Sequence, residues 1–82
     1  MWYIYILLCA DNSLYTGSTN DVEKRFKDHL LGKGAKYTKS HKPVKIIYTE
    51  KLASKGEALK REAEIKKLTR NEKETLITSS GV

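Results

Sequence analysis

The 82-residue sequence lacks several features that mark particular classes of protein. It contains one cysteine, Cys9, so it can form no internal disulfide and cannot build a cysteine-rich zinc site. It also lacks a long hydrophobic run, because the apolar stretch 1–10 is too short to span a bilayer and has no basic flank. We therefore expect a cytoplasmic protein with no membrane association, in which Cys9 is a buried, inert thiol.

The chain is also too short for several architectures. Multi-domain proteins, repeat solenoids and large cofactor-binding folds are excluded by a length of 82 residues. A hydrophobic share of 39% is nevertheless enough for one small core. The sequence therefore predicts a single domain.

Acidic residues are outnumbered. The sequence contains sixteen Lys and Arg residues but only ten Asp and Glu residues, which gives a net charge of +6. Residues 1–20 contain no Lys or Arg, whereas the segment 33–45 contains five lysines, at positions 33, 36, 39, 42 and 45, and no acidic residue. A basic excess of this kind favours polyanionic partners, nucleic acid above all.

The first half of the sequence predicts a β-hairpin and a helix. Aromatic and β-branched residues fill 2–8, turn residues fill 11–13, and the strand pattern resumes over 14–18. The first strand is apolar on both faces, so we expect it to be central in the sheet. A helix is predicted over 21–31, with Asn20 and Glu23 as its capping box and Val22, Phe26 and Leu30 as its buried stripe.

The second half predicts one strand and two helices. The strand covers 44–48 and follows Pro43, and capping boxes at Ser54 and Thr69 start helices over 55–68 and 70–78. Residues 79–82 are expected to fray from a domain of residues 1–78. The predicted fold is α/β: a three-stranded antiparallel sheet flanked by helices, in the order β-β-α-β-α-α.

Three polar residues occupy positions that packing alone does not explain. Glu62 falls at the edge of the inward face of its helix, where it either pairs with Lys66 one turn later or serves as a ligand. Arg25 and His29 are one turn apart beside an apolar stripe. Arg25 either lies over the hydrophobic edge or binds a phosphate, and His29 is either a boundary residue or a catalyst.

Together these residues resemble a known family. The order Tyr3-Ile4-Tyr5, then Tyr15-Thr16-Gly17, then Arg25 and a later helical glutamate is similar to the GIY-YIG endonuclease superfamily. The runs 14–19, 32–38 and 59–62 resemble its small stand-alone bacterial branch, the YhbQ-like proteins. The likeness extends from Trp2 to about Ile77 and departs from the founding motif at Tyr3, in place of glycine, and Thr16, in place of isoleucine.

The resemblance implies a role for each matching residue. Tyr5 and Tyr15 would line the site of a phosphodiester-cleaving enzyme, and Arg25 would contact the scissile phosphate. His29 stands where relatives carry a histidine, a tyrosine or another polar group. Glu62 would be the lone carboxylate that holds one Mg²⁺ or Mn²⁺ ion, because Mg²⁺ keeps several waters and needs few protein ligands. The identity of the general base stays open.

Two further features would serve the same site. Gly17 either allows close approach of the substrate or marks a β-bulge. Lys36, Lys39 and Lys42 would contact a phosphate backbone, and Tyr37 would stack on a base, unless this lysine-rich segment is merely solvated.

The leading hypothesis is a metal-dependent endonuclease acting on single-stranded or distorted DNA, in repair or recombination. A non-catalytic nucleic-acid-binding module that keeps the fold is the first alternative. A subunit that works with a protein partner, or as a homodimer that supplies a second module, is another. Lysine contacts to a backbone do not distinguish DNA from RNA.

Overall fold

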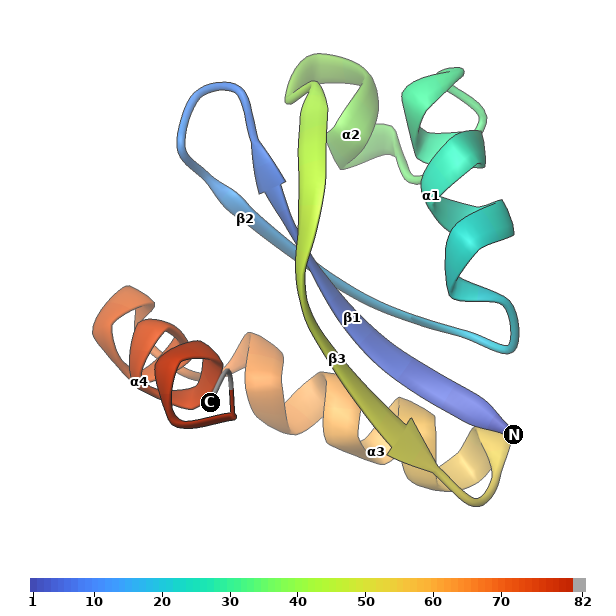
Figure 1. The fold of residues 1–82 in the computed structure, drawn as a ribbon, viewed down its shortest axis with the longest axis vertical. Coiled ribbons are helices and arrows are strands. Elements are labelled where there is room, and N and C mark those ends of the chain that lie inside the picture. Colours follow the sequence, from blue (N-terminus) through green and yellow to red (C-terminus); the bar gives the residue numbers. More distant parts are fainter. Residues whose placement is uncertain (81–82) are drawn as a thin grey trace.

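Three strands form one antiparallel sheet in the computed structural model, which describes residues 1–80 (Figure 1). The strands are β1 (Trp2–Cys9), β2 (Leu14–Thr19) and β3 (Pro43–Leu52), and the helices are α1 (Val22–Leu30), α2 (Lys36–Ser40), α3 (Lys55–Lys66) and α4 (Arg70–Ser80). The strand order is β2-β1-β3. Both the expected fold class and the central place of the first strand are confirmed.

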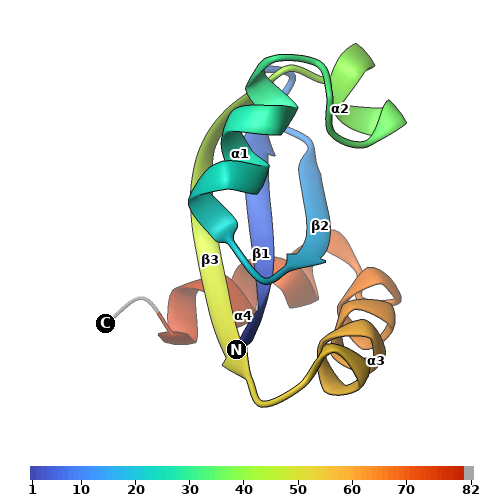
Figure 2. The same ribbon diagram turned by 90° about the vertical axis from the view of Figure 1, so that its right-hand side faces the viewer.

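Helices cover both faces of the sheet, with α1 and α2 on one side and α3 and α4 on the other (Figures 1 and 2). Alternate residues of β1 serve the two layers. Ile4 and Ile6 pack with Ile65 of α3 in the main core, whereas Tyr5 points to the opposite face and bonds His29 of α1. Burial on both faces explains why β1 is apolar along its whole length.

Helix α1 differs from its prediction at both ends. Its N-cap is Asp21, whose side chain accepts a hydrogen bond from the Lys24 amide at 3.1 Å, so the predicted Asn20–Glu23 capping box is wrong. The Thr19 hydroxyl accepts a hydrogen bond from the Asp21 amide at 3.1 Å. The helix therefore begins at Val22, one residue after its predicted start. At the other end Leu30 is 46% exposed while His29 is only 1% exposed, so the predicted apolar stripe gives way to a buried polar residue.

The lysine-rich segment is partly helical. Helix α2 lies within it, an element that the lysine pattern did not predict. Strand β3 runs to Leu52, four residues past its expected end, because it pairs with the whole of β1, from Trp2 opposite Leu52 to Cys9 opposite Pro43.

The C-terminal helices begin where their capping boxes predict. The Ser54 hydroxyl accepts from the Glu57 amide, and Thr69 and Glu72 exchange hydrogen bonds between side chain and backbone. Helix α4 continues to Ser80, beyond the predicted end at residue 78, and the rest of the expected tail, 81–82, lies outside the described residues.

Two expectations drawn from what the sequence lacks can be compared with the fold. Cys9 is free and buried, as expected. Within residues 1–80, no helix has the length and apolar character needed to cross a membrane.

Two buried side-chain atoms have no hydrogen-bond partner within residues 1–80, the Thr16 hydroxyl and His41 Nδ1. The hydroxyls of Thr19 and Thr38 and the ring of His29 are all hydrogen bonded. The Thr16 hydroxyl, on the core face of β2, has none among the described residues. A buried polar group without a partner lowers stability.

This contrast gives a paired test on two equally buried threonines. We expect Thr16→Val to leave the free energy of unfolding unchanged or to raise it by about 1 kcal/mol, because it removes an unpaired hydroxyl at constant shape. Thr38→Val should lower it by about 1–3 kcal/mol, because it breaks bonds to His29 and to the Ala35 carbonyl. Urea unfolding followed by circular dichroism measures both. Equal losses in the two variants would contradict the assignment.

Candidate active site

Two tyrosines and a histidine from three different elements meet on the α1 face of the sheet. Tyr5 comes from β1, Tyr15 from β2 and His29 from α1. The ring centroids are 6.3 Å apart for Tyr5 and Tyr15, 5.8 Å for Tyr5 and His29, and 5.2 Å for Tyr15 and His29. The structure thus brings together three residues that the sequence placed in one site.

The Tyr5 ring lies directly over Gly17, its cross-strand partner. A Cβ atom at position 17 would stand 2.5 Å from the Tyr5 hydroxyl oxygen and 2.6 Å from Cζ. The β1–β2 register passes through this pair without a shift, so the β-bulge interpretation of Gly17 is wrong. Glycine is required here because the phenol of Tyr5 fills the space of a side chain.

His29 is held by both ring nitrogens. Its Nε2 lies 2.8 Å from the Tyr5 hydroxyl and its Nδ1 lies 2.7 Å from the Thr38 hydroxyl. Gly34 makes room for the ring, because a Cβ atom at that position would collide with Nδ1, Cε1 and Cγ of His29. The orientation of the imidazole is therefore fixed from two sides.

Burial keeps this pair neutral at physiological pH. It raises the pKa of Tyr5 to about 12, with a further contribution from Tyr15. It lowers the pKa of His29, and the positive charge of Arg25 lowers it further. Tyr5 therefore holds its proton at pH 7, and His29 has an uncharged ring that can accept one.

Arg25, one turn before His29 on α1, brings positive charge to the same place. Besides its effect on His29, it lowers the pKa of Tyr5 and partly offsets the rise due to burial. Within residues 1–80 no carboxylate forms an ion pair with it. Its guanidinium is thus free to bind an anion.

Glu62 reaches this region from the opposite helical layer. Helix α3 lies beside β2, at the lower right of Figure 2, and Glu62 Oε1 accepts a 2.6 Å hydrogen bond from Ser18 of β2. Its other oxygen is 2.7 Å from Lys66 Nζ, so the i, i+4 pair considered from the sequence does form. Glu62 also raises the pKa of Tyr5, after the larger effects of burial and Tyr15.

The donors near Glu62 fit only a loosely held metal ion. Residues 1–80 contain no group of three or more His, Cys, Asp or Glu side chains able to hold a metal. A single carboxylate, 18% exposed and fixed through one oxygen, suits a hydrated Mg²⁺ or Mn²⁺ ion that takes its other ligands from water and substrate.

Basic residues border the other side of the cluster. Lys36 and Lys39 lie on α2, and Lys42 follows it. Lys39 and Lys42 line a pocket of about 370 Å³ together with His29 and Thr38, on the far side of the histidine from Tyr5. The lysine segment therefore adjoins the histidine of the site.

Tyr37 of α2 joins the aromatic cluster from outside. Its ring stacks on Tyr15 at 5.8 Å with an interplanar angle of 25°, and His41 packs edge-on at 4.0 Å. The Tyr37 side chain remains partly exposed. It is therefore the outermost ring of the aromatic cluster.

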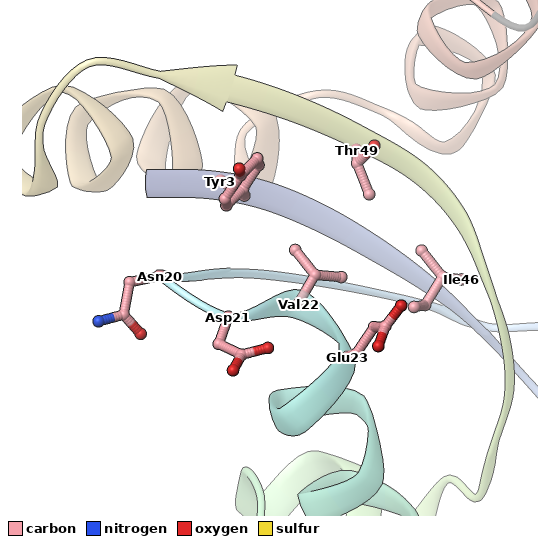
Figure 3. Close-up of a pocket in the computed structure, with 7 residues that line it drawn as sticks. All are labelled: Tyr3, Asn20, Asp21, Val22, Glu23, Ile46 and Thr49. Carbon is pink, nitrogen blue, oxygen red and sulfur yellow. The ribbon is translucent and has the colours of Figure 1, made fainter. Parts of the chain in front are cut away.

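A larger pocket of about 460 Å³ lies elsewhere, at the N-terminus of α1 (Figure 3). Tyr3, Val22 and Thr49 form part of its lining, and the carboxylates of Asp21 and Glu23 lie at its edge. It contains none of the candidate site residues. Two carboxylates at the rim make it a poor place for a phosphate backbone.

Three residues that hold the site together escaped the sequence analysis. Ser18 binds Glu62, Thr38 binds His29, and Gly34 makes room for that histidine. Ser18 bonds a residue 44 positions away, so no local pattern could reveal it. Gly34 and Thr38 fall in the run 32–38 that resembles the family, but that likeness assigned a role to neither residue.

Comparison with known proteins places this geometry in a family. The family model described as the GIY-YIG catalytic domain matches residues 1–75. The chain belongs to the GIY-YIG family. Membership in this family of nuclease domains supports nuclease activity and implies a nucleic-acid substrate, and GIY-YIG nucleases generally use divalent metal ions.

Close relatives share the small size of this GIY-YIG domain. A UPF0213 protein of Clostridium perfringens is 56% identical over 82 residues, which is 100% of this chain and 88% of the relative. The solution NMR structure of a UPF0213 protein from Bacillus halodurans is 48% identical, with a TM-score of 0.64, over 99% of this chain and 87% of that one. That of a protein from E. faecalis is 42% identical, with a TM-score of 0.62, over 98% and 86%. The domain is thus a member of the small stand-alone branch expected from the sequence.

The fit of Tyr5 over Gly17 can be tested with two glycines. We expect Gly17→Ala to lower the free energy of unfolding by about 1–3 kcal/mol and to displace Tyr5 from His29, because the new methyl group overlaps the phenol ring. Gly56→Ala in α3 is the matched control. Its Cβ atom would be 3.9 Å from the nearest atom, so it should be neutral or stabilising by up to about 1 kcal/mol. Denaturant unfolding measures stability, and NMR shifts of the Tyr5 ring report its position. An unmoved ring in Gly17→Ala would contradict the close fit.

The neutral state of His29 predicts a pH dependence of stability. Its pKa is lower in the folded than in the unfolded chain, so the folded state binds fewer protons. The contribution of this residue is therefore complete above the unfolded pKa of about 6.5 and is lost as the pH falls towards the folded value. Urea unfolding between pH 7.5 and pH 5 should show this loss. In His29→Gln, which has no titrating ring, the profile should be flatter, and identical slopes for the two proteins would refute the interpretation.

Proposed function

We propose that this chain is a metal-dependent endonuclease that hydrolyses phosphodiester bonds in DNA. The observation that carries the proposal is the Tyr5–His29 hydrogen bond beside an arginine that has no acidic partner within residues 1–80. A hydroxyl bonded to a neutral base is suited to remove a proton from water. An unpaired guanidinium next to it is suited to bind the phosphate that the water attacks.

The hydrogen-bond partners of His29 determine which of its ring nitrogens carries the proton. The Thr38 hydroxyl has one hydrogen and donates it to the Ala35 carbonyl at 2.9 Å. Nδ1 has two neighbours, the Thr38 hydroxyl at 2.7 Å and the Ala35 amide at 3.4 Å. Because the Thr38 contact is much the shorter, we assign the His29 proton to Nδ1, donating to Thr38, which leaves Nε2 to accept from Tyr5. In this tautomer Tyr5 takes the proton of the attacking water while passing its own proton to His29. Tyr5 alone, with a pKa of about 12, would be too rarely ionised at pH 7 to do so.

The remaining residues act on the charge of the phosphate. Arg25 stabilises the negative charge that develops on the phosphoryl oxygens. Glu62, oriented by Ser18, would hold a Mg²⁺ or Mn²⁺ ion, which supplies Lewis-acid stabilisation of the same charge and of the leaving oxygen. Tyr15 packs against Tyr5 and His29 and holds the two rings in place.

The lysine segment and Tyr37 favour an unpaired or distorted strand as the substrate. Lys36, Lys39 and Lys42 would track the backbone without reading its sequence. The partly exposed ring of Tyr37 would stack on a base that is not held in a duplex. Such a substrate suits a role in repair or recombination. The free, buried thiol of Cys9 favours the reducing environment of the cytoplasm. A partner protein or a second copy of this chain would add further contacts to the nucleic acid.

One observation favours the alternative of a non-catalytic binding module. The second oxygen of Glu62 is already paired with Lys66, so the carboxylate could serve α3 alone. On that hypothesis the lysine segment would carry the function and Glu62 would be dispensable.

A cleavage assay separates the two functions. We expect nicking of supercoiled DNA and cutting of labelled single-stranded DNA with Mg²⁺ or Mn²⁺ and none with EDTA. Glu62→Gln, Arg25→Ala and Tyr5→Phe should each lower the cleavage rate by about a hundredfold or more, because each removes charge stabilisation or proton transfer. Lys60→Gln, an exposed change on the same helix as Glu62, is the control and should cut normally.

Binding must be measured on the same variants. Glu62→Gln should retain its affinity for single-stranded DNA, and the triple change of Lys36, Lys39 and Lys42 to Gln should weaken it and reduce its salt dependence. Binding without cutting in the wild-type protein, unaffected by Glu62→Gln, would replace the nuclease with the binding module.

A further inference from the structure

Glu62 already holds a positive charge at the position where a metal ion would bind. Lys66 Nζ lies 2.7 Å from its Oε2 atom, while Oε1 receives the Ser18 hydroxyl at 2.6 Å. Both oxygens of Glu62, the one carboxylate that residues 1–80 bring to this site, are therefore engaged. A cation approaching Glu62 must replace at least one of these contacts.

The two contacts differ in how readily they can be given up. Ser18 lies on β2, paired with Ile4 of the central strand, so its hydroxyl is held by the sheet. Lys66 is one helical turn from Glu62, and its side chain is 50% exposed at the end of a flexible stem. An i, i+4 ion pair whose lysine is half exposed contributes only modest stability, so the ammonium can move into water at small cost. Ser18 is the fixed contact and Lys66 the exchangeable one.

We propose that the Lys66 ammonium occupies the metal position on Glu62 and that metal loading is an exchange in which Lys66 leaves while Ser18 keeps the carboxylate oriented. The inference rests on the proposed role of Glu62 as metal ligand. Oxygen Oε1 stays on Ser18, and Oε2 passes from the ammonium to the cation.

Because Lys66 occupies Glu62, the protein without substrate has a low affinity for a divalent metal ion. A unit positive charge within a few ångströms of a divalent cation opposes its binding, both by repulsion and by competition for the same oxygen. A phosphodiester arriving at Arg25 would reverse this balance. It would offer oxygens to the metal and negative charge to the released ammonium. Metal affinity should therefore rise when substrate is present.

Manganese binding to the intact chain tests the exchange directly. The affinity for Mn²⁺ is read from the loss of the free-ion signal in electron paramagnetic resonance, without DNA. We expect Lys66→Met to bind Mn²⁺ about fivefold or more tightly than the wild-type protein. Lys66→Arg, which keeps the cation, should show no such gain. Lys67→Met is the matched control, since it removes the same charge from a neighbouring exposed lysine that does not contact Glu62.

Ser18 and Glu62 variants complete the test. Ser18→Ala should weaken Mn²⁺ binding by about tenfold, as expected when the partner that orients a ligand is lost. Glu62→Gln should abolish the site in every background. Equal affinities for Lys66→Met and Lys67→Met would overturn the exchange and leave the metal site intact. The absence of Glu62-dependent binding in all variants, including Lys66→Met, would overturn both the exchange and the metal role of Glu62 in the proposed function.

Discussion

The position of the Tyr5 ring over Gly17 is the constraint on which the rest of the site depends. The absence of a side chain at residue 17 lets the phenol lie flat across β2, and this directs its hydroxyl to His29 Nε2 at 2.8 Å. The histidine is then fixed at Nδ1 by Thr38 and given space by Gly34. Because Tyr5, Gly17, His29 and Thr38 are all buried, a change in one of them displaces the next.

Strand β2 organises both halves of the site through its two faces. Tyr15 and Gly17 point towards α1 and contact the tyrosine–histidine cluster, whereas Ser18 points the other way and bonds Glu62. Six consecutive residues, Leu14–Thr19, thus set the position of the tyrosine–histidine cluster relative to the carboxylate. The period of two in a strand is what allows one segment to serve two layers.

A second contact fixes the helix that carries the carboxylate. Arg61, adjacent to Glu62, binds Glu50 of β3 through Nε at 2.8 Å and through Nη2 at 3.3 Å. Glu50 also accepts the Tyr48 hydroxyl at 2.5 Å. A two-point arginine–carboxylate contact restricts rotation of α3 as well as its distance from the sheet. Ser18 and Glu50 therefore hold α3 from two different strands, through Glu62 and Arg61 respectively.

The sequence predicted the parts of the structure that depend on local patterns. Strand alternation, capping boxes at Ser54 and Thr69 and the tyrosine and arginine spacing together indicated the fold and the residues that meet in it. The sequence did not predict features that depend on contacts between residues far apart in the chain. His29 rather than Leu30 is buried because Tyr5 and Thr38 satisfy its nitrogens, and neither partner is visible from the helix pattern. Ser18 is one polar residue among several until the chain folds Glu62 onto it.

The balance of charge in the site suggests an order of events. Tyr5 and His29 are neutral at pH 7. The charged groups of the site are therefore the cations Arg25 and Lys66 and the anion Glu62. With the nearby lysines of 33–45 added, positive charge dominates before any ligand arrives. Such a site attracts a phosphate more strongly than a metal ion. On the proposed function, a bound phosphate would neutralise this excess, and its oxygens would supply metal ligands that one carboxylate does not. On that proposal, Glu62 would be half of a metal site whose other half is the substrate.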